Sequence, residues 1–466
     1  MIDVIYRSKR LASVLGEPSY DDKKSYKSSM FNYIVCLEDK YLVCNTLMRT
    51  FVSVKGDAEC FFKDSTQFHE VLPTPDTNTL IKLRVLVPTD LDEVKLYREL
   101  YDLMLAIENK KQGVERYNIL TTTGCNARCF YCYEEGLPVH TMTMEDADKV
   151  SAYILHTHNK KAPIYLRWFG GEPLVNSRVM DSISSFLIKH DVSFYSTMST
   201  NGLLIDEKLL DKAINLWQMK KIRISMDGFA DEHNRRKAYV NKCIDGFQVT
   251  LENIERIVNS PITMTIRLNI DSNNVDSIKK LVDYFVSKYK GRKNFNMYVR
   301  CLIDEISLDR VKNDPDHVNY MLSIKKELED YIRSQQMFDF DKLPLFGFRA
   351  YYCAGNNPNK VTILPNGLLC SCECFCYDYS HWGTVSEGIT NIEEYQRWIK
   401  GIYLKTCEGC CFLPGCTPFI GKCPMRNYDC KVKASMLLTD YMTENYRRFC
   451  VGEPIIEELV YSDYDY

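Results

Sequence analysis

Residues 121–136 read TTTGCNARCFYCYEEG and place Cys125, Cys129 and Cys132 in a C-x3-C-x2-C arrangement. This segment directly follows YNILT, a short apolar run that predicts a β-strand. Three thiolates on one tight loop can hold three corners of a cubane iron–sulfur cluster, which takes one thiolate per iron and leaves the fourth iron open. A structural zinc site is the alternative, but zinc sites usually close with four ligands and this loop supplies no fourth Cys or His. The loop therefore favours an iron–sulfur cluster.

Short apolar strands alternate with helix-period segments from Tyr117 onward. After YNILT, the expected strands are IYLRWFG, VSFYSTMST, KIRISMDG, ITMTIRLNI and FNMYVRCL, and the expected helices lie near 143–158, 176–189, 206–216, 245–258 and 274–289. This alternation predicts parallel strands joined by crossover helices. Six such units are too few for a closed eight-stranded barrel, so we expect an α/β fold with an open, partial barrel.

Small and polar residues stand where several of these strands end. WFGGEP at 168–173 ends the second strand, STMSTNG at 196–202 the third and ISMDG at 224–228 the fourth. Each is by itself an ordinary turn sequence. On the fifth strand Arg267 and Asn269 alternate and so face one side together, although an ion-paired or solvated barrel position would explain them equally well. Because ligands gather at the carboxyl ends of parallel strands, the order of these motifs predicts one shared site.

The combination resembles the radical S-adenosylmethionine (SAM) superfamily, whose fingerprint is C-x3-C-x2-C after the first strand of a partial (βα)6 barrel. The resemblance implies that Cys125, Cys129 and Cys132 are the catalytic residues, because they bind the [4Fe–4S] cluster that cleaves SAM. It also implies that a GGE-type motif meets the amino group of the SAM methionine. The cofactor-binding residues expected in this way are Tyr131, Gly170, Gly171, Glu172, Thr197, Asn201, Ser225, Asp227, Arg267 and Asn269.

Cysteines are concentrated near the C-terminus. Of the 20 cysteines in the chain, eleven fall between Cys353 and Cys430. A reducing compartment gives disulfides little opportunity, so clustering of this kind indicates metal ligation. Cys353 is followed by thirteen residues, Gly367, four residues and Cys372, and then comes Cys407-x2-Cys410-x5-Cys416-x6-Cys423-x6-Cys430.

This pattern resembles the SPASM domain, a C-terminal extension of radical SAM enzymes that modify peptides and proteins, which binds two auxiliary [4Fe–4S] clusters. The resemblance implies one cluster on Cys407, Cys410, Cys416 and Cys430 and another on Cys353, Cys372 and Cys423, so that the chain holds three clusters in all. Six residues separate Cys416 from Cys423 where the family pattern has three, which requires a looped-out insertion. A zinc ribbon is the alternative for residues 407–430.

The cluster on Cys353, Cys372 and Cys423 lacks an evident fourth protein ligand. If CSCEC forms a strand, then Cys370, Cys374 and Cys376 share one face with Cys372, and one of them can close the cluster. If none does, one iron stays available to substrate. Five further cysteines are expected to be buried hydrophobes: Cys36, Cys44, Cys60, Cys243 and Cys450.

At 466 residues the chain is long enough for several modules. The expected organisation is an N-terminal α+β accessory domain at 1–112, the partial barrel at 113–310, a helical bridge at 311–349, the SPASM domain at 350–435, and a C-terminal helix with an acidic tail at 436–466. In the accessory domain, NYIVCLED and KYLVCNTLMRTFVSV predict a hairpin, and LDEVKLYRELYDLMLAIENK predicts a helix. An exposed strand edge there can recruit an extended peptide.

The charges favour neither nucleic acid nor an anionic membrane as a partner. With 59 basic and 62 acidic side chains the net charge is -3, which creates no strong field of either sign. The chain starts without the pattern of a signal peptide, and no apolar run approaches the length that spans a bilayer. We therefore expect a cytoplasmic protein.

The resemblance implies an oxidoreductase that acts as a maturase. Such an enzyme cleaves SAM reductively to a 5′-deoxyadenosyl radical and installs an intramolecular crosslink, a thioether or a related bond, in a ribosomally synthesised precursor peptide. The implied partners are that peptide and an electron donor such as flavodoxin or ferredoxin. The alternatives are formylglycine formation of the sulfatase-maturing type, peptide epimerisation, and a zinc-binding protein that only binds partners.

Overall fold

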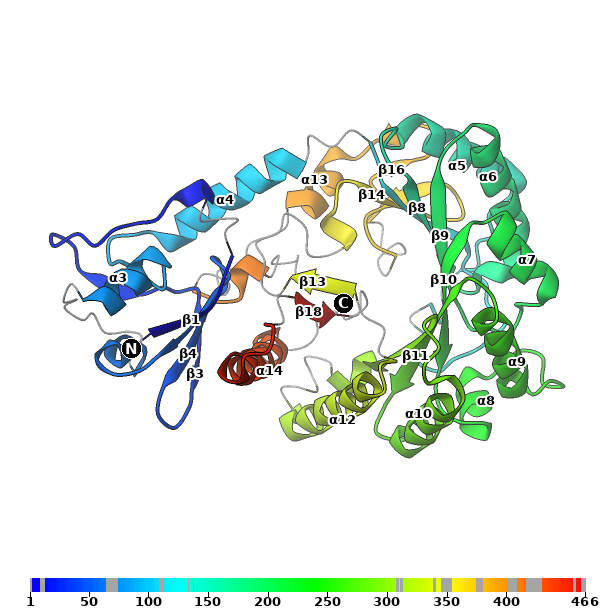
Figure 1. The fold of residues 1–466 in the computed structure, drawn as a ribbon. Helices are drawn as coiled ribbons and strands as arrows, with labels where there is room; N and C mark the ends of the chain where they lie inside the picture. Colours follow the sequence, from blue (N-terminus) through cyan, green and yellow to red (C-terminus); the bar gives the residue numbers. More distant parts are fainter. Residues whose placement is uncertain are drawn as a thin grey trace.

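The computed structural model describes residues 2–8, 13–63, 74–108, 113–132, 134–136, 138–306, 310, 313–337, 341–344, 354–373, 380–400, 409–415, 430–455 and 458–461. Figure 1 shows an N-terminal part in blue at one end of the molecule and an open barrel in cyan to green at the other. The C-terminal helix, in red, lies beside the N-terminal sheet.

Six parallel strands follow one another across the main sheet in the order of the chain. They are β7 (Arg116–Thr122), β8 (Ile164–Gly170), β9 (Phe194–Thr200), β10 (Met219–Met226), β11 (Thr263–Ile270) and β12 (Phe295–Cys301). Among the described residues β12 pairs only with β11, so the sheet stays open at this edge. The predicted partial barrel of six parallel strands is confirmed.

Helices cover the outer face of these strands. They are α5 (Met144–Thr157), α6 (Ser177–Lys189), α7 (Glu207–Asn215), α9 (Gly246–Val258) and α10 (Val275–Tyr289). Alternate strand side chains, such as Leu166 and Trp168 of β8, are buried against them in one large apolar core. The side chains between these positions, such as Arg167, therefore face the concave side. An additional short helix, α8 (Asp231–Lys237), lies between β10 and α9 and was not predicted.

The sheet continues beyond the six strands into the cysteine-dense part of the chain. β14 (Lys360–Ile363) pairs in parallel with β7, and β15 (Leu368–Cys370), β16 (Gly383–Thr384) and β17 (Gly388–Ile389) follow in antiparallel order. A buried ion-pair network strengthens this connection. Glu373 accepts hydrogen bonds from Arg167 of β8 at 2.7 Å, Asn118 of β7 at 3.0 Å and Lys360 of β14 at 3.2 Å. Residues 360–389 thus extend the barrel sheet.

The N-terminal part contains a four-stranded antiparallel sheet in the order β1-β5-β4-β3. Its strands are β1 (Ile2–Arg7), β3 (Asn32–Cys36), β4 (Tyr41–Asn45) and β5 (Thr50–Val54), while β2 (Tyr26–Ser28) pairs with β6 (Leu86–Pro88). The helices of this part are α2 (Cys60–Lys63), α3 (Pro75–Lys82) and α4 (Glu93–Glu108). The predicted hairpin and helix are confirmed.

Both faces of the N-terminal sheet are covered. Val43 and Val52 pack on one face with α2 and α3. On the other face, Leu42 and Phe51 pack against Phe412 and against helix α14 (Cys430–Val451). The N-terminal part is therefore joined to the C-terminal segment by a shared apolar core.

The remaining elements lie towards the C-terminus. They are α12 (Pro315–Ser334), β13 (Asp341–Pro344), α13 (Ile392–Lys400) and β18 (Glu458–Tyr461), of which β13 and β18 pair with each other. The predicted helices near 315–335 and 432–448 correspond to α12 and α14. None of the helices in the described part of the chain combines the length and the apolarity needed to span a bilayer.

Candidate functional site

The cysteine loop begins where β7 ends, at the carboxyl rim of the parallel strands. Cys125, Cys129 and Cys132 are partly buried and carry free thiols. Cys132 N–H donates to the Cys129 carbonyl at 3.0 Å, and Ala127 N–H points at Cys125 Sγ at 3.4 Å. Backbone amides thus shape the loop and face one of its sulfur atoms.

The electrostatic environment of these thiols suits a bound metal centre. Burial raises the pKa of Cys125 to about 11, and Glu172, Cys129 and Cys132 add to the rise. Burial likewise raises the pKa of Cys132. Thiolates at these positions therefore need a compensating cation, which a metal supplies. No three His, Cys, Asp or Glu side chains in the described ranges converge on one metal ion. A [4Fe–4S] cluster does not need that convergence, since each thiolate binds a different iron.

Gly170 and Gly171 permit the end of β8 to lie against the start of the cysteine loop. Gly170 has a φ of +125°, and a Cβ added to it would lie 2.1 Å from the Thr122 carbonyl oxygen. A Cβ on Gly171 would lie 2.6 Å from the carbonyl oxygens of Thr123 and Gly124. The Gly171 N–H donates to Thr122 O at 3.0 Å. Only glycine fits this close approach of two backbones.

Glu172 connects the ends of β8 and β9. Its carboxylate has no exposed surface and accepts hydrogen bonds from Thr200 Oγ1 at 2.8 and 2.9 Å and from the Asn201 N–H at 2.8 Å. Burial raises the pKa of Glu172 to about 7. The carboxylate is thus engaged within the protein, and its expected contact with the SAM amino group remains a prediction.

Asn201 continues this chain of contacts to the cysteine loop. Its Nδ2 donates to Asn126 Oδ1 at 2.6 Å and lies 3.8 Å from Cys125 Sγ. Thr197 lies four residues deeper in β9, about 13 Å from Asn201 along an extended strand. Its Oγ1 is hydrogen-bonded to Tyr165 OH at 2.5 Å. The structure therefore brings Asn201 to the rim but leaves Thr197 inside the concave face.

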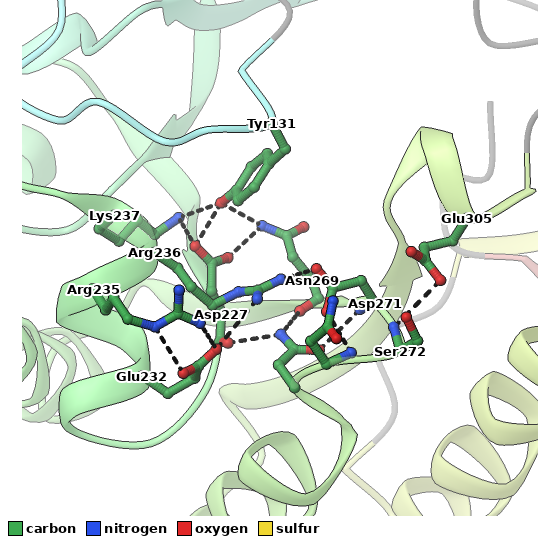
Figure 2. Close-up of polar contacts among 12 residues, drawn as sticks. Tyr131, Asp227, Glu232, Arg235, Arg236, Lys237, Asn269, Asp271, Ser272 and Glu305 are labelled. Carbon is green, nitrogen blue, oxygen red and sulfur yellow. Dashed lines mark hydrogen bonds and ion pairs between the residues drawn. The ribbon is translucent and has the colours of Figure 1, made fainter.

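A polar network joins the cysteine loop to the ends of β10 and β11 (Figure 2). Tyr131 OH donates to Asp227 Oδ2 at 2.6 Å and accepts from Asn269 Nδ2 at 3.2 Å. The buried ammonium of Lys237 lies 3.3 Å from Asp227 Oδ2 and donates to Ser225 Oγ at 2.9 Å and to Tyr131 OH at 3.1 Å. Four of the predicted cofactor-binding residues, Tyr131, Ser225, Asp227 and Asn269, therefore belong to one connected group.

The charges of this group are balanced by its neighbours. Burial would raise the pKa of Asp227, but the Lys237 ammonium, together with the neighbouring His233 and the hydrogen bonds from Tyr131 and Asn269, outweighs burial and holds that pKa below its ordinary value. Burial, reinforced by Lys237, lowers the pKa of His233 to about 3, so its imidazole is neutral and accepts from the Asp227 N–H at 3.4 Å. Asp227 is therefore a carboxylate whose counter-ion is Lys237.

Several buried polar atoms around this rim have no partner among the described residues. They are Asn126 Nδ2, Arg267 Nε and Asn269 Oδ1. Two are donors and one is an acceptor, and they come from the cysteine loop and from β11. Buried groups of this kind are normally hydrogen-bonded, so they call for a ligand that both accepts and donates. SAM, which carries a carboxylate, an ammonium and two hydroxyls, fits this requirement.

Comparison with known proteins agrees with this geometry. Residues 119–285 match the family model described as Radical SAM superfamily. These residues form a radical SAM domain. They contain the cysteine loop, the GGE segment, Asp227 and Asn269. The chain is therefore an enzyme that contains a radical SAM domain.

Curated relatives match the chain in part. A GTP 3′,8-cyclase of Clostridium perfringens is 22% identical over 309 residues, which cover 63% of this chain and 90% of that protein. A probable GTP 3′,8-cyclase of Methanosarcina mazei is 25% identical over 206 residues, which cover 42% of this chain and 58% of that protein.

Two solved structures share the fold over most of the chain. Native anSMEcpe with bound AdoMet and Cp18Cys peptide has a TM-score of 0.55 and 17% identity, covering 72% of this chain and all (100%) of that chain. Streptococcus suis SuiB bound to the precursor peptide SuiA has a TM-score of 0.51 and 13% identity, covering 86% of this chain and 98% of that chain.

Sequence reasoning missed the contribution of α8 to this polar network. This helix supplies Lys237 and His233, and its Arg236 forms a buried ion pair with Asp271 after β11 (Figure 2). DEHNRRK places acids in the first turn and bases in the last, with Glu232 spaced to pair with Arg235 and Arg236. That charge pattern was the signal that predicts a short helix here.

The predicted auxiliary ligands are only partly within the described residues. Cys372 and Cys410 are partly buried, and Cys430 is the first residue of α14. Cys353, Cys407, Cys416 and Cys423 lie outside the described residues, as do Cys374 and Cys376. The auxiliary clusters remain a prediction.

Two expectations about the other cysteines require correction. β15 ends at Cys370, so CSCEC is not one continuous strand, and Cys370 is buried with Leu120 and Leu364 in an apolar cluster. Cys36, Cys243 and Cys450 were expected to be buried but are exposed, because they lie at a strand end, on a loop and near the end of α14. Cys44 is buried as expected, and Cys60 is intermediate.

Proposed function

We propose that this radical SAM enzyme is a maturase that installs an intramolecular crosslink, a thioether or a related bond, in a ribosomally synthesised precursor peptide. The observation that carries the proposal is the presence of three partly buried thiols on one loop and of buried polar atoms without partners among the described residues at the same rim, next to a cysteine-dense segment that continues the same sheet. The likeness of the fold to SuiB bound to a precursor peptide and to anSMEcpe bound to a peptide supports a peptide substrate.

Cys125, Cys129 and Cys132 would hold the cluster, and the rim would hold SAM. When bound, the cluster supplies the electron that splits SAM into methionine and a 5′-deoxyadenosyl radical. Arg267 is suited to the SAM carboxylate because its guanidinium is cationic and its buried Nε lacks a partner. Asn269 Oδ1 is an acceptor suited to an ammonium or a hydroxyl.

Glu172 and Asn201 would act on the cofactor through the cysteine loop. Glu172 fixes the Asn201 backbone, and the Asn201 side chain holds Asn126 beside Cys125. A loop held in this way keeps its sulfur atoms in place when the cluster is absent. Preorganisation of this kind reduces the reorganisation that cluster binding and electron transfer require.

The crosslinking reaction needs an acceptor for one electron. Forming a thioether removes one hydrogen from a carbon and one from a thiol, and makes one C–S bond. The carbon-bound hydrogen leaves as an atom with 5′-deoxyadenosine, and the thiol hydrogen leaves as a proton. One electron remains, and we assign its uptake to an auxiliary iron–sulfur cluster, which Cys407, Cys410, Cys416 and Cys430 would hold as one set of ligands and Cys353, Cys372 and Cys423 as the other.

The N-terminal sheet is the element that we propose binds the peptide. In the described residues β3 pairs with β4 alone, so one edge of β3 keeps its backbone hydrogen-bonding groups available. An extended peptide can add to such an edge as a further strand. One face of this sheet packs on Phe412 and α14. A peptide bound at the edge of β3 would therefore lie next to the C-terminal segment.

A second candidate is chemistry on a nucleotide. The curated relatives are named GTP 3′,8-cyclase or probable GTP 3′,8-cyclase, although the Clostridium perfringens protein matches only 63% of this chain. Against this candidate stands the N-terminal sheet, which would have no role in it. GTP therefore serves as the competing substrate in the test.

The experiment combines anaerobically prepared enzyme, SAM and a reductant with either GTP or the peptide encoded by the short reading frame nearest to the gene. We expect 5′-deoxyadenosine and a peptide product that has lost two hydrogen atoms. Exchange of a cysteine sulfur for oxygen together with the loss of two hydrogen atoms would indicate formylglycine formation, and uptake of one deuterium from heavy water without other mass change would indicate epimerisation. Turnover of GTP with an unchanged peptide would contradict the proposal.

A further inference from the structure

The backbone on both sides of helix α8 has positive φ angles, which are uncommon outside glycine. The helix is flanked by Ala230 with a φ of 46° and by Ala238 with a φ of 44°, a region of backbone conformation that favours glycine. Strain of this kind persists only where surrounding contacts enforce it, and it is common at functional sites. At Ala238, the cysteine loop supplies one such contact, because the Ala238 carbonyl accepts from the Arg128 N–H at 3.2 Å.

The C-terminal end of α8 forms backbone hydrogen bonds with the cysteine loop. Arg128 N–H donates to the carbonyls of Lys237 at 2.9 Å and Ala238 at 3.2 Å. Cys129 Sγ lies 3.9 Å from the Lys237 carbonyl, and Val240 N–H donates to Asn126 O at 2.9 Å. A segment more than 100 residues away in sequence thus fixes the turn that carries two of the three thiols.

The Lys237 side chain reaches the same loop from the other side. Its ammonium is 2% exposed and is bound by Asp227, Ser225 and Tyr131, the residue that precedes Cys132. Burial would lower the pKa of Lys237, but Asp227 and Cys129 outweigh it and raise that pKa, so the ammonium keeps its charge. The buried positive charge therefore lies beside the cysteine loop, at the residue next to Cys132.

We propose that Lys237 is a positioning residue of the cysteine loop and that its buried charge raises the reduction potential of the cluster held there. This inference rests on the proposed function, because it requires a cluster on Cys125, Cys129 and Cys132. Reduction adds an electron to the cluster, and a nearby cation in a low-dielectric site stabilises the added charge. Asp227 carries the opposite charge 3.3 Å from the ammonium, so the two charges must be replaced singly and together to separate their effects.

Redox titration of the reconstituted full-length chain tests the effect of the charge. The titration follows, by electron paramagnetic resonance, the cluster whose signal changes on adding SAM. We expect Lys237→Met to shift its potential to more negative values and Asp227→Asn to shift it to more positive values, with Lys237→Met/Asp227→Asn between the two. Lys242→Met, which removes an exposed charge five residues further on, should leave the potential unchanged. Equal potentials in all four variants and the wild type would overturn the inference.

Alkylation of the chain without iron tests the positioning separately. In Lys237→Met, Tyr131 and the loop lose their bond to the ammonium, so Cys129 should react with iodoacetamide several-fold faster than in the wild type. The exposed Cys243 is the internal control and should react equally in both. Equal rates at Cys129 would overturn the positioning role. A wild type with no SAM-responsive cluster but with faster Cys129 alkylation in Lys237→Met would instead contradict the proposed function.

If Lys237→Met fails to fold, the double variant Lys237→Met/Asp227→Asn replaces it. That variant removes the buried carboxylate together with its counter-ion, so no unpaired charge stays in the core. It should then show a potential more negative than that of Asp227→Asn alone. A potential equal to that of Asp227→Asn would overturn the inference.

Discussion

Glu172 accepts a hydrogen bond from the Asn201 backbone amide at 2.8 Å, and this contact ties the end of β8 to the end of β9 at the base of the cysteine loop. The carboxylate is buried, and burial raises its pKa to about 7. The GGE segment therefore connects two strand ends beneath the cysteine loop, independently of any contact that it makes with SAM.

The first prediction concerns the pH dependence of stability in the chain without metal. The ordinary pKa of 4.5 applies to Glu172 in the unfolded chain and about 7 in the folded chain. The folded state therefore binds the proton on Glu172 more tightly than the unfolded chain does. The resulting contribution to the free energy of unfolding is fully present below pH 4.5 and falls by roughly 3 kcal/mol as the pH rises to about 7. Glu172→Gln should remove this loss, so its stability relative to the wild type should increase between pH 5 and 8. Denaturant unfolding at several pH values measures this, and parallel curves for the two proteins would contradict it.

The second prediction concerns Gly171. Its φ is not positive, so an added Cβ meets no backbone strain but lies 2.6 Å from two carbonyl oxygens of the cysteine loop. Gly171→Ala should cost about 1 to 3 kcal/mol and lower the iron bound at the loop. Gly291→Ala is the control, because a Cβ there has open space around it but a φ of +86°. It should lower stability by about 1 kcal/mol and leave iron binding unchanged. A Gly171→Ala protein with full iron content would argue against the tight approach.

The third prediction concerns the joint between the N-terminal sheet and the C-terminal segment. Phe412 packs against Tyr33 with ring centroids 5.3 Å apart, and Thr46 Oγ1 donates to the carbonyl of the neighbouring Cys411. Phe412→Ala should cost about 3 to 5 kcal/mol and reduce auxiliary iron, because Cys410 loses its support. Phe449→Ala, on an exposed position of α14, is the matched control and should change neither. Iron analysis and thermal unfolding distinguish the two variants. Equal iron content in both would show that Phe412 does not support the position of Cys410.

The packing of the N-terminal sheet on Phe412 and α14 means that peptide recruitment cannot be tested by deleting the N-terminal part. Removal of residues 1–110 would strip the apolar partners from Phe412 and α14, so loss of binding would have two causes. A point substitution at the open edge of β3 avoids this ambiguity.

The fourth prediction therefore uses Cys36, an exposed residue at the end of β3. Leu37 N–H donates to Lys40 O, and Thr46 N–H donates to Phe31 O. In an antiparallel ladder, hydrogen-bonded and non-hydrogen-bonded pairs alternate, so Cys36 and Tyr41 form a non-hydrogen-bonded pair. The Cys36 amide therefore points away from β4. Cys36→Pro should weaken precursor binding about 2- to 10-fold by removing one hydrogen-bond donor, while Cys36→Ser keeps the amide and binds normally. Isothermal titration with the precursor measures both, and equal affinities would mean that this edge does not bind the peptide.

The parts of the fold that the sequence predicted are those set by local patterns. Alternating apolar residues in β8 and β10 and helix-period segments between the strands predicted six parallel units and the rim on which the cysteine loop lies. The pairing of β14 with β7 depends on contacts between residues more than 240 positions apart, and no local pattern encodes them. The role of Glu172 was also beyond sequence reasoning, because its burial depends on how Thr200 and Asn201 fold over it.

Lys237 was missed for a related reason. In sequence it is one base in a charged run, and such runs usually face solvent. It is buried because its ammonium is surrounded by Asp227, Ser225 and Tyr131, which come from distant parts of the sequence or from another element.

We propose that Cys125, Cys129 and Cys132 hold the cluster that cleaves SAM. Formation of 5′-deoxyadenosine from SAM is measured with the reduced full-length chain and with a variant in which all three cysteines are replaced by alanine. We expect 5′-deoxyadenosine from the wild type and none from the variant, with iron retained in the C-terminal part of that variant. Normal SAM cleavage by the triple alanine variant would show that these cysteines do not hold the cluster.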